Sequence, residues 1–289
     1  SNGGPLALIR LEPNGQFDNA FYAQAGDANV AGDAVNIQAL KALPDGRVYV
    51  GGVFDSFNNE PRANLARLLT DGTLDNTFCP MWTNRLEARL LALQPDGKLL
   101  VGGRPLDGPP HHGYLVRFNP GGSLDPSFTS PWGDGWDMRL HCLALQADGK
   151  IVIGGEFADG LARLNPDGSL DDTFHPPYLP AFDGDAVYAL AVQPDGKILF
   201  GGTTAIGIRR LHPDGMADPT FNFDAPVGYL IQDIVVQPDG SILIAGLSCI
   251  WVGDEPRGIA RLYPDGRVDA SFNARIGTSI DTLTVAPDG

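Results

Sequence analysis

The chain has 289 residues, 43% of them apolar, which is enough for one large domain with a buried core. Its net charge of −15 argues against nucleic acid and anionic membrane surfaces as partners, because phosphate binding needs a basic face. The three cysteines form neither a disulfide framework nor a zinc motif, and no run of 18 apolar residues predicts membrane insertion.

From the N-terminus onward, one module is repeated six times along the chain. It contains an apolar run ending in Pro-Asp-Gly, a second apolar run ending in paired glycines, Leu-x-Arg-Leu, another Asp-Gly turn and Asp-x-x-Phe. The first-turn aspartates recur at intervals of 51, 52, 47, 44 and 49 residues, at Asp45, Asp96, Asp148, Asp195, Asp239 and Asp288. Such intervals, with four short apolar runs per module and no helical period, predict an all-β fold, a β-propeller of four-stranded antiparallel blades.

We expect residues 1–289 to form a single β-propeller domain that is a segment of a longer protein. Six blades are expected, with seven as the alternative. The blade repeats are expected at 35–80, 86–130, 139–176, 186–222 and 230–273, with 280–289 and 5–21 forming a split blade. The split is expected because the sequence begins and ends within the module.

The second hairpin of each module predicts a cross-strand ion pair. With the Asp-Gly turn in the loop, an arginine lies opposite an aspartate eight residues later, where opposite charges stabilise the pairing of strands. The six predicted pairs are Arg10 and Asp18, Arg67 and Asp75, Arg117 and Asp125, Arg163 and Asp171, Arg210 and Asp218, and Arg261 and Asp269. Because a catalytic site needs one copy at one place, six copies favour a structural role.

Two further repeated features are interpreted as packing devices. The phenylalanine that ends each module is expected to pack between blades, at Phe21, Phe78, Phe128, Phe174, Phe221 and Phe272. The paired glycines are expected where the backbone passes close to a neighbour, since no helix follows to make a phosphate-binding loop.

The string Leu-Ala-Leu-Gln-Pro-Asp-Gly, followed by a strand ending in Gly-Gly and by Leu-Ala-Arg-Leu-Asn-Pro-Asp-Gly-Ser-Leu-Asp-x-x-Phe, resembles the delta-60 repeat family of bacterial β-propeller proteins. It is clearest at 91–103 and 161–174. The resemblance implies a propeller domain of secreted or surface-attached bacterial proteins, without a general catalytic assignment. The chain departs from the pattern at Gly103-Arg104-Pro105, Gly202-Thr203-Thr204 and Ala245-Gly246-Leu247.

Function is expected on the face that carries the variable connections. An up-and-down meander places both Asp-Gly turns of a blade on one face, and the connections after Gly-Gly and after Asp-x-x-Phe on the other. Unrepeated aromatic residues fall in these connections and are candidate platforms for a glycan or a protein partner: Trp82, Trp132, Trp136, Tyr178, Phe182 and Trp251. The alternative is that they seal blade junctions.

These observations favour a non-enzymatic binding or scaffold module of a bacterial exported or cell-surface protein, with no cofactor, no metal and no catalytic residue assigned. One alternative is a propeller enzyme acting on polysaccharide, with loop carboxylates as general acid and base, from Asp134, Asp137, Asp183 and Asp185. The same carboxylates could bind calcium, although Asx turns beside glycine explain them more simply. A further alternative is a structural assembly unit.

Overall fold

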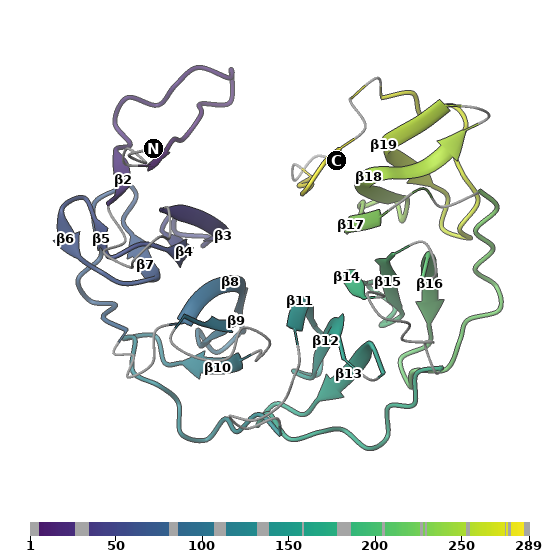
Figure 1. Ribbon diagram of the computed structural model, residues 1–289, viewed down its shortest axis with the longest axis horizontal. Helices are drawn as coiled ribbons and strands as arrows, with labels where there is room; N and C mark the ends of the chain where they lie inside the picture. The colour runs from purple at the N-terminus through teal and green to yellow at the C-terminus, as the bar shows by residue number, and fades with distance from the viewer. Residues whose placement is uncertain are drawn as a thin grey trace. The chain divides into compact units, whose positions relative to one another are not determined.

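The computed structural model describes residues 6–26, 35–80, 86–106, 114–131, 139–157, 159–177, 186–203, 206–225, 228, 230–252, 255–274, 276 and 279–285. These residues form antiparallel strands joined by turns, and none of them is helical. The chain divides into two compact units, Ser1–Arg139 and Leu140–Gly289, each of which consists of consecutive small sheets (Figure 1).

Unit 1 contains three antiparallel sheets. The first has the order β1-β2-β5-β6, and the others have the orders β3-β4-β7 and β10-β9-β8. The strands are β1 (Leu6–Leu8), β2 (Ala23–Gly26), β3 (Asn36–Ala42), β4 (Val48–Val53), β5 (Ser56–Phe57), β6 (Glu60–Pro61), β7 (Leu65–Leu68), β8 (Leu86–Leu93), β9 (Leu99–Pro105) and β10 (Tyr114–Phe118).

Unit 2 repeats the three-stranded pattern with sheets in the orders β11-β12-β13, β14-β15-β16 and β17-β18-β19. Its strands are β11 (Arg139–Leu145), β12 (Ile151–Glu156), β13 (Leu161–Leu164), β14 (Val187–Val192), β15 (Ile198–Gly202), β16 (Ile208–Leu211), β17 (Leu230–Val236), β18 (Ile242–Val252) and β19 (Glu255–Leu262). The all-β propeller class expected from the repeat is therefore confirmed, since five small antiparallel sheets repeat the same three-stranded pattern.

In the five sheets other than β1-β2-β5-β6, the expected fourth strand is reduced to a single bridge, so these blades are three-stranded. In the second module, Leu68 pairs with Leu74, and the other modules have equivalent bridges. The aspartate that follows ends the pairing: the Asp75 side chain accepts a hydrogen bond from the Thr77 N–H at 3.0 Å, and its carbonyl accepts one from the Phe78 N–H at 3.1 Å. This local turn replaces strand hydrogen bonds directly after the bridge.

The Asp-Gly turns are tight hairpin loops closed by glycine in the left-handed region. In the first of them, Gly46 has a φ of 85° and donates its N–H to the Leu43 carbonyl at 3.0 Å. Glycine takes this conformation without the steric cost of a Cβ atom.

The hydrophobic cores of both units lie between consecutive sheets. In unit 1, Tyr49 and Leu65 of one sheet form a cluster with Leu99, Val101 and Phe118 of the next. In unit 2, Leu199 clusters in the same way with residues of β17, β18 and β19. Four of the phenylalanines that end the modules belong to such clusters, Phe21, Phe78, Phe174 and Phe221, and Phe78 is fully buried. Within each unit, a sheet thus buries a face against the sheet next to it in sequence.

The segment 279–285 lies against the last sheet of unit 2. Ser279 forms a bridge with Leu247, and Asp233 accepts hydrogen bonds from Thr282 Oγ1 at 2.9 Å and from the Leu283 N–H at 2.7 Å. The single domain and the blade split between the termini remain predictions.

Candidate functional site

Most of the side chains predicted to bind a ligand lie outside the described residues. These are Trp82, Trp132, Trp136, Tyr178 and Phe182, together with Asp134, Asp137, Asp183 and Asp185. The backbone of Trp251 lies in β18, where it pairs with Pro256 of β19, and its side chain is outside the described part. The candidate site in the described residues therefore consists of side chains of the sheets, some repeated in every module and others not.

The structure brings together both members of each Arg–Asp pair named from the sequence. In every module the arginine Nε donates to the aspartate Oδ2, at 2.6–2.8 Å. The guanidinium also lies over the phenylalanine that ends the module, as Arg67 does with 5.1 Å to the centroid of Phe78. A cation and a ring at this distance attract each other.

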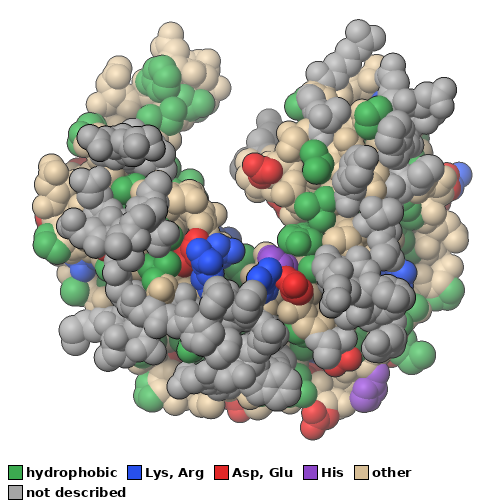
Figure 2. Space-filling model, viewed as in Figure 1, with side chains coloured by type: hydrophobic (Ala, Val, Ile, Leu, Met, Phe, Trp, Pro, Cys, Tyr) green, Lys and Arg blue, Asp and Glu red, His purple; other side chains and the backbone are tan. Residues whose placement is uncertain are grey.

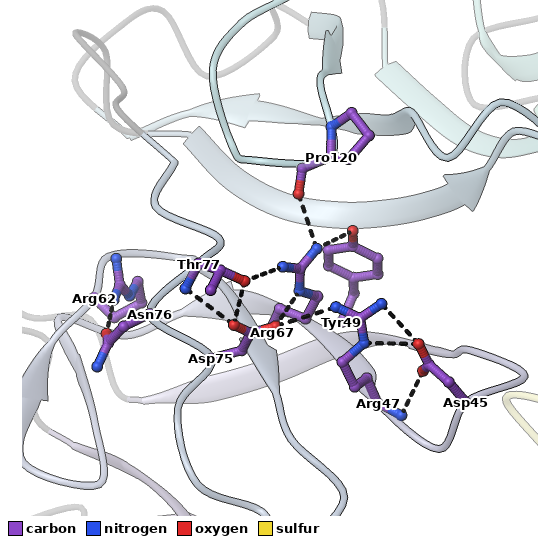
Figure 3. A network of polar contacts seen from close by, with 9 residues as sticks. All are labelled: Asp45, Arg47, Tyr49, Arg62, Arg67, Asp75, Asn76, Thr77 and Pro120. Atoms are coloured by element: carbon purple, nitrogen blue, oxygen red, sulfur yellow. Dashed lines mark hydrogen bonds and ion pairs between the residues drawn. The ribbon is translucent and has the colours of Figure 1, made fainter.

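The arginine also joins its module to the next one. Arg67 Nη1 donates to the Pro120 carbonyl in the second turn of the following module at 2.9 Å, and Arg210 does the same to Pro264 at 2.6 Å. Figure 3 shows Arg67 reaching from Asp75 and Thr77 to Pro120. Only glycine fits at this position in the turn of the next module, since a Cβ atom on Gly122 would lie 2.6 Å from the backbone of Cys79.

A second cation completes this arrangement in several modules, and the sequence interpretation missed it. Lys98 Nζ lies 2.9 Å from Asp125 Oδ2, and Lys150 Nζ lies 2.8 Å from Asp171 Oδ2. The signal was available, because a lysine or arginine follows the first-turn glycine in several modules. We call the Arg–Asp pair, the phenylalanine and the turn that the arginine contacts in the next module the inter-module clamp.

Hydrogen bonds keep the aspartates of the clamp ionised. Burial raises the pKa of Asp75, but hydrogen bonds from Thr77 and Arg67 outweigh this and lower it to about 2. The pKa is also lowered in the other five clamp aspartates, Asp18, Asp125, Asp171, Asp218 and Asp269. Repetition and low pKa values indicate structural ion pairs rather than acid–base groups.

The paired glycines lie opposite a β-bulge in the first strand of the module. A Cβ atom on Gly103, the second glycine of its pair, would overlap the carbonyl oxygen of Glu87 on β8. Opposite these glycines, the first strand of the module contains one extra residue that has no partner in the pairing register. This residue is Gln38 in β3, Arg89 in β8, Tyr188 in β14 and Gln232 in β17. Bulges re-aim the side chain of the extra residue.

The bulge is repeated, whereas its side chain is not. The extra residue lies seven positions before the first-turn aspartate, and His141 takes this position in the fourth module. The five side chains are an amide, a guanidinium, an imidazole, a phenol and an amide. The variable connections also join each sheet at this end. A repeated backbone therefore carries a different side chain there in each module.

In unit 1, the bulge residues meet a buried carboxylate. Glu87, only 2% exposed, accepts hydrogen bonds from Arg104 Nε and Gln38 Nε2, and from Arg89 Nη2 at 3.1 Å. Burial raises the pKa of Glu87, but the hydrogen bonds from Arg104 and Arg89 outweigh it and lower the pKa. Basic side chains lie beside an acidic one over this end of β8 and β9 (Figure 2). We call Gln38, Glu87, Arg89 and Arg104 the arginine cluster.

In unit 2, two of the side chains at this position contact each other. The His141 and Tyr188 rings are stacked with their centroids 4.3 Å apart and an angle of 27° between their planes. Buried Oε1 of Gln232 has no hydrogen-bond partner. A buried acceptor of this kind can be satisfied by a water molecule or by a ligand.

The described residues contain neither a cluster of metal ligands nor a membrane-spanning helix. No three or more His, Cys, Asp or Glu side chains in the described ranges are grouped so that they could hold a metal ion. Within the same ranges, no helix has the length and apolar character needed to cross a membrane.

Repeated sheets, inter-module clamps and turns at fixed positions define a repeat β-propeller. Residues 43–78, 94–128, 146–174, 193–221 and 237–272 match the family described as "Domain of unknown function (DUF5122) beta-propeller". These segments make up more than half of the chain, which therefore belongs to this family. The resemblance to delta-60 repeats remains a prediction. No curated protein sequence matches the chain.

Solved structures with the same fold have diverse descriptions. Virginiamycin B lyase from Staphylococcus aureus is 14% identical, with a TM-score of 0.55 over 96% of this chain and 87% of that one. A gluconolactonase from Xanthomonas campestris is 15% identical, with a TM-score of 0.52 over 86% and 78%. An extracellular domain from Bacteroides thetaiotaomicron, described as part of a hybrid two component system, is 14% identical, with a TM-score of 0.52 over 89% and 33%. At these identities the likeness concerns the fold alone.

Proposed function

We propose that this chain is a binding module of an exported or cell-surface bacterial protein and that it recognises a glycan through the variable end of its sheets. The observation that carries the proposal is the repeated bulge with an unrepeated side chain. Arg89, Tyr188 and Gln232 take equivalent backbone positions and supply different chemistry. The repeated clamp residues, in contrast, are engaged in joining modules.

The exported location is part of the proposal. The extracellular domain from Bacteroides thetaiotaomicron shows that the fold occurs outside the cell.

A glycan array on the folded chain tests the proposal. We expect a restricted set of glycans to bind, and Gln232→Ala to weaken binding by about tenfold, because a buried hydrogen bond to ligand is lost. Gln16→Ala is the matched control, since Gln16 lies exposed in a second-hairpin turn. Trp132→Ala and Trp136→Ala test whether the loop aromatics contribute.

Silence of the whole array, unchanged by these substitutions, would remove glycan recognition and favour a protein partner or an assembly role. Chemical turnover of a bound glycan would instead support a polysaccharide-acting enzyme. In that case, loss of turnover on substituting Asp134, Asp137, Asp183 or Asp185 would identify the carboxylates responsible.

A further inference from the structure

We propose that the arginine cluster of unit 1 is a subsite for an acidic sugar, in which Arg89 and Arg104 bind the carboxylate of a uronate residue. This inference rests on the proposed glycan-binding function and adds the chemical class of ligand. It concerns unit 1 alone.

The charge balance of the cluster favours an anion. Two guanidinium groups share one carboxylate, that of Glu87, which leaves one positive charge in excess. The protein as a whole has a net charge of −15, so this local excess opposes the prevailing charge. Two cations also share the clamp carboxylate of Asp75, but there the second cation, Arg47, has a carboxylate of its own in Asp45. The exposed pair of Arg267 and Asp265 is likewise balanced one to one.

The cluster also has donors that its own carboxylate leaves unused. The Arg89 side chain is 38% exposed and that of Arg104 is 42% exposed, whereas Glu87 is enclosed. Arg89 Nε is buried and has no hydrogen-bond partner. Arginine presents five N–H donors in a planar fork, and its geometry matches a carboxylate.

The backbone holds these donors in place before a ligand arrives. Glu87 and Arg104 are opposite one another on β8 and β9, and the bulge sets Arg89 beside them. The shared carboxylate fixes both guanidinium groups, which reduces the entropy lost on binding.

Gln38 favours a sugar over an acidic peptide. Its Nε2 donates to Glu87, so its Oε1 is left to accept a hydrogen bond from a ligand. A uronate offers both a carboxylate for the arginines and hydroxyl groups for this acceptor. An acidic peptide offers backbone N–H donors instead, and these are joined to the carboxylate by a flexible side chain rather than held on the same ring.

Calorimetry with three probes tests the inference: trigalacturonate, the neutral sugar galactotriose and a tri-glutamate peptide. We expect trigalacturonate to bind at least tenfold more tightly than either of the others. Arg89→Gln and Arg104→Gln should each weaken its binding by about tenfold, and added salt should weaken it further. Arg267→Gln should leave it unchanged.

The possible failures can be told apart. Tight galactotriose binding that is indifferent to both arginines would overturn the acidic-sugar subsite and leave the glycan-binding function standing. Absence of trigalacturonate binding also overturns the subsite, and a silent glycan array in addition would remove the proposed function. Equal binding of tri-glutamate through the same arginines would overturn the sugar class. If either Gln variant unfolds at lower temperature, Arg89→Lys and Arg104→Lys replace it, because they keep the charge and lose the fork.

Discussion

Asp75 accepts hydrogen bonds from two arginines and a threonine while its side chain is almost fully enclosed. We expect Asp75→Asn to lower the free energy of unfolding by about 3 kcal/mol, because the buried guanidinium of Arg67 loses its counter-charge. Urea unfolding at pH 7 measures the change. Asp45→Asn is the matched control and should leave the urea midpoint unchanged, because its ion pair with Arg47 is exposed. An equal loss in both variants would mean that burial of the pair is unimportant.

The partners of single residues could be predicted from the sequence only where hairpin register sets them. The separation of eight residues places Arg67 opposite Asp75 without knowledge of anything beyond the hairpin. The contact from Arg67 to the Pro120 carbonyl was not predicted, since it depends on how one module docks on the next. The charged contacts of Glu87 were also missed, because a bulge cannot be recognised from alternating apolar residues alone.

At the scale of the strand, the second glycine of each pair permits the bulge. We expect Gly103→Ala to lower the free energy of unfolding by about 3 kcal/mol, because its Cβ atom would overlap the Glu87 carbonyl. Gly121→Ala is the matched control, since the nearest atom to its added Cβ atom is Thr77 O at 3.9 Å. Urea unfolding compares the two. Similar stability for both variants would show that the glycine pair is not needed for the bulge.

The sequence predicts the number and order of the sheets better than their width. Apolar runs and Asp-Gly turns locate the first three strands of each module, because both are local signals. The fourth run also has strand character, but the aspartate that follows Leu74 forms its own turn and leaves one bridge. Competition between a side-chain hydrogen bond and a strand ladder decided this outcome.

For the whole molecule, the clamp aspartates predict a steep loss of stability in acid. Their pKa values are lower in the folded chain than in the unfolded chain, so the unfolded state binds more protons as pH falls. The stabilisation is complete above about pH 5 and is lost as pH falls toward about 2, the pKa of folded Asp75. Urea midpoints measured from pH 6 to pH 2.5 should therefore decrease, and less so in Asp75→Asn. A constant midpoint across this range would contradict the prediction.

The arginine of the inter-module clamp contacts the module that follows it in sequence, and it binds a main-chain carbonyl there rather than a side chain. Arg67 contacts the carbonyl of Pro120, while the equivalent contact of Arg10 is to Thr70, so the identity of the contacted residue is free to change. What the clamp requires of the next module is a carbonyl and a glycine at the turn. A duplicated or transplanted module would therefore keep the clamp contact whatever residue supplies the carbonyl, while the side chains of the core between the sheets would still have to fit. A gene can then lengthen, recombine or diversify this array while each copy acquires its own residue at the bulge.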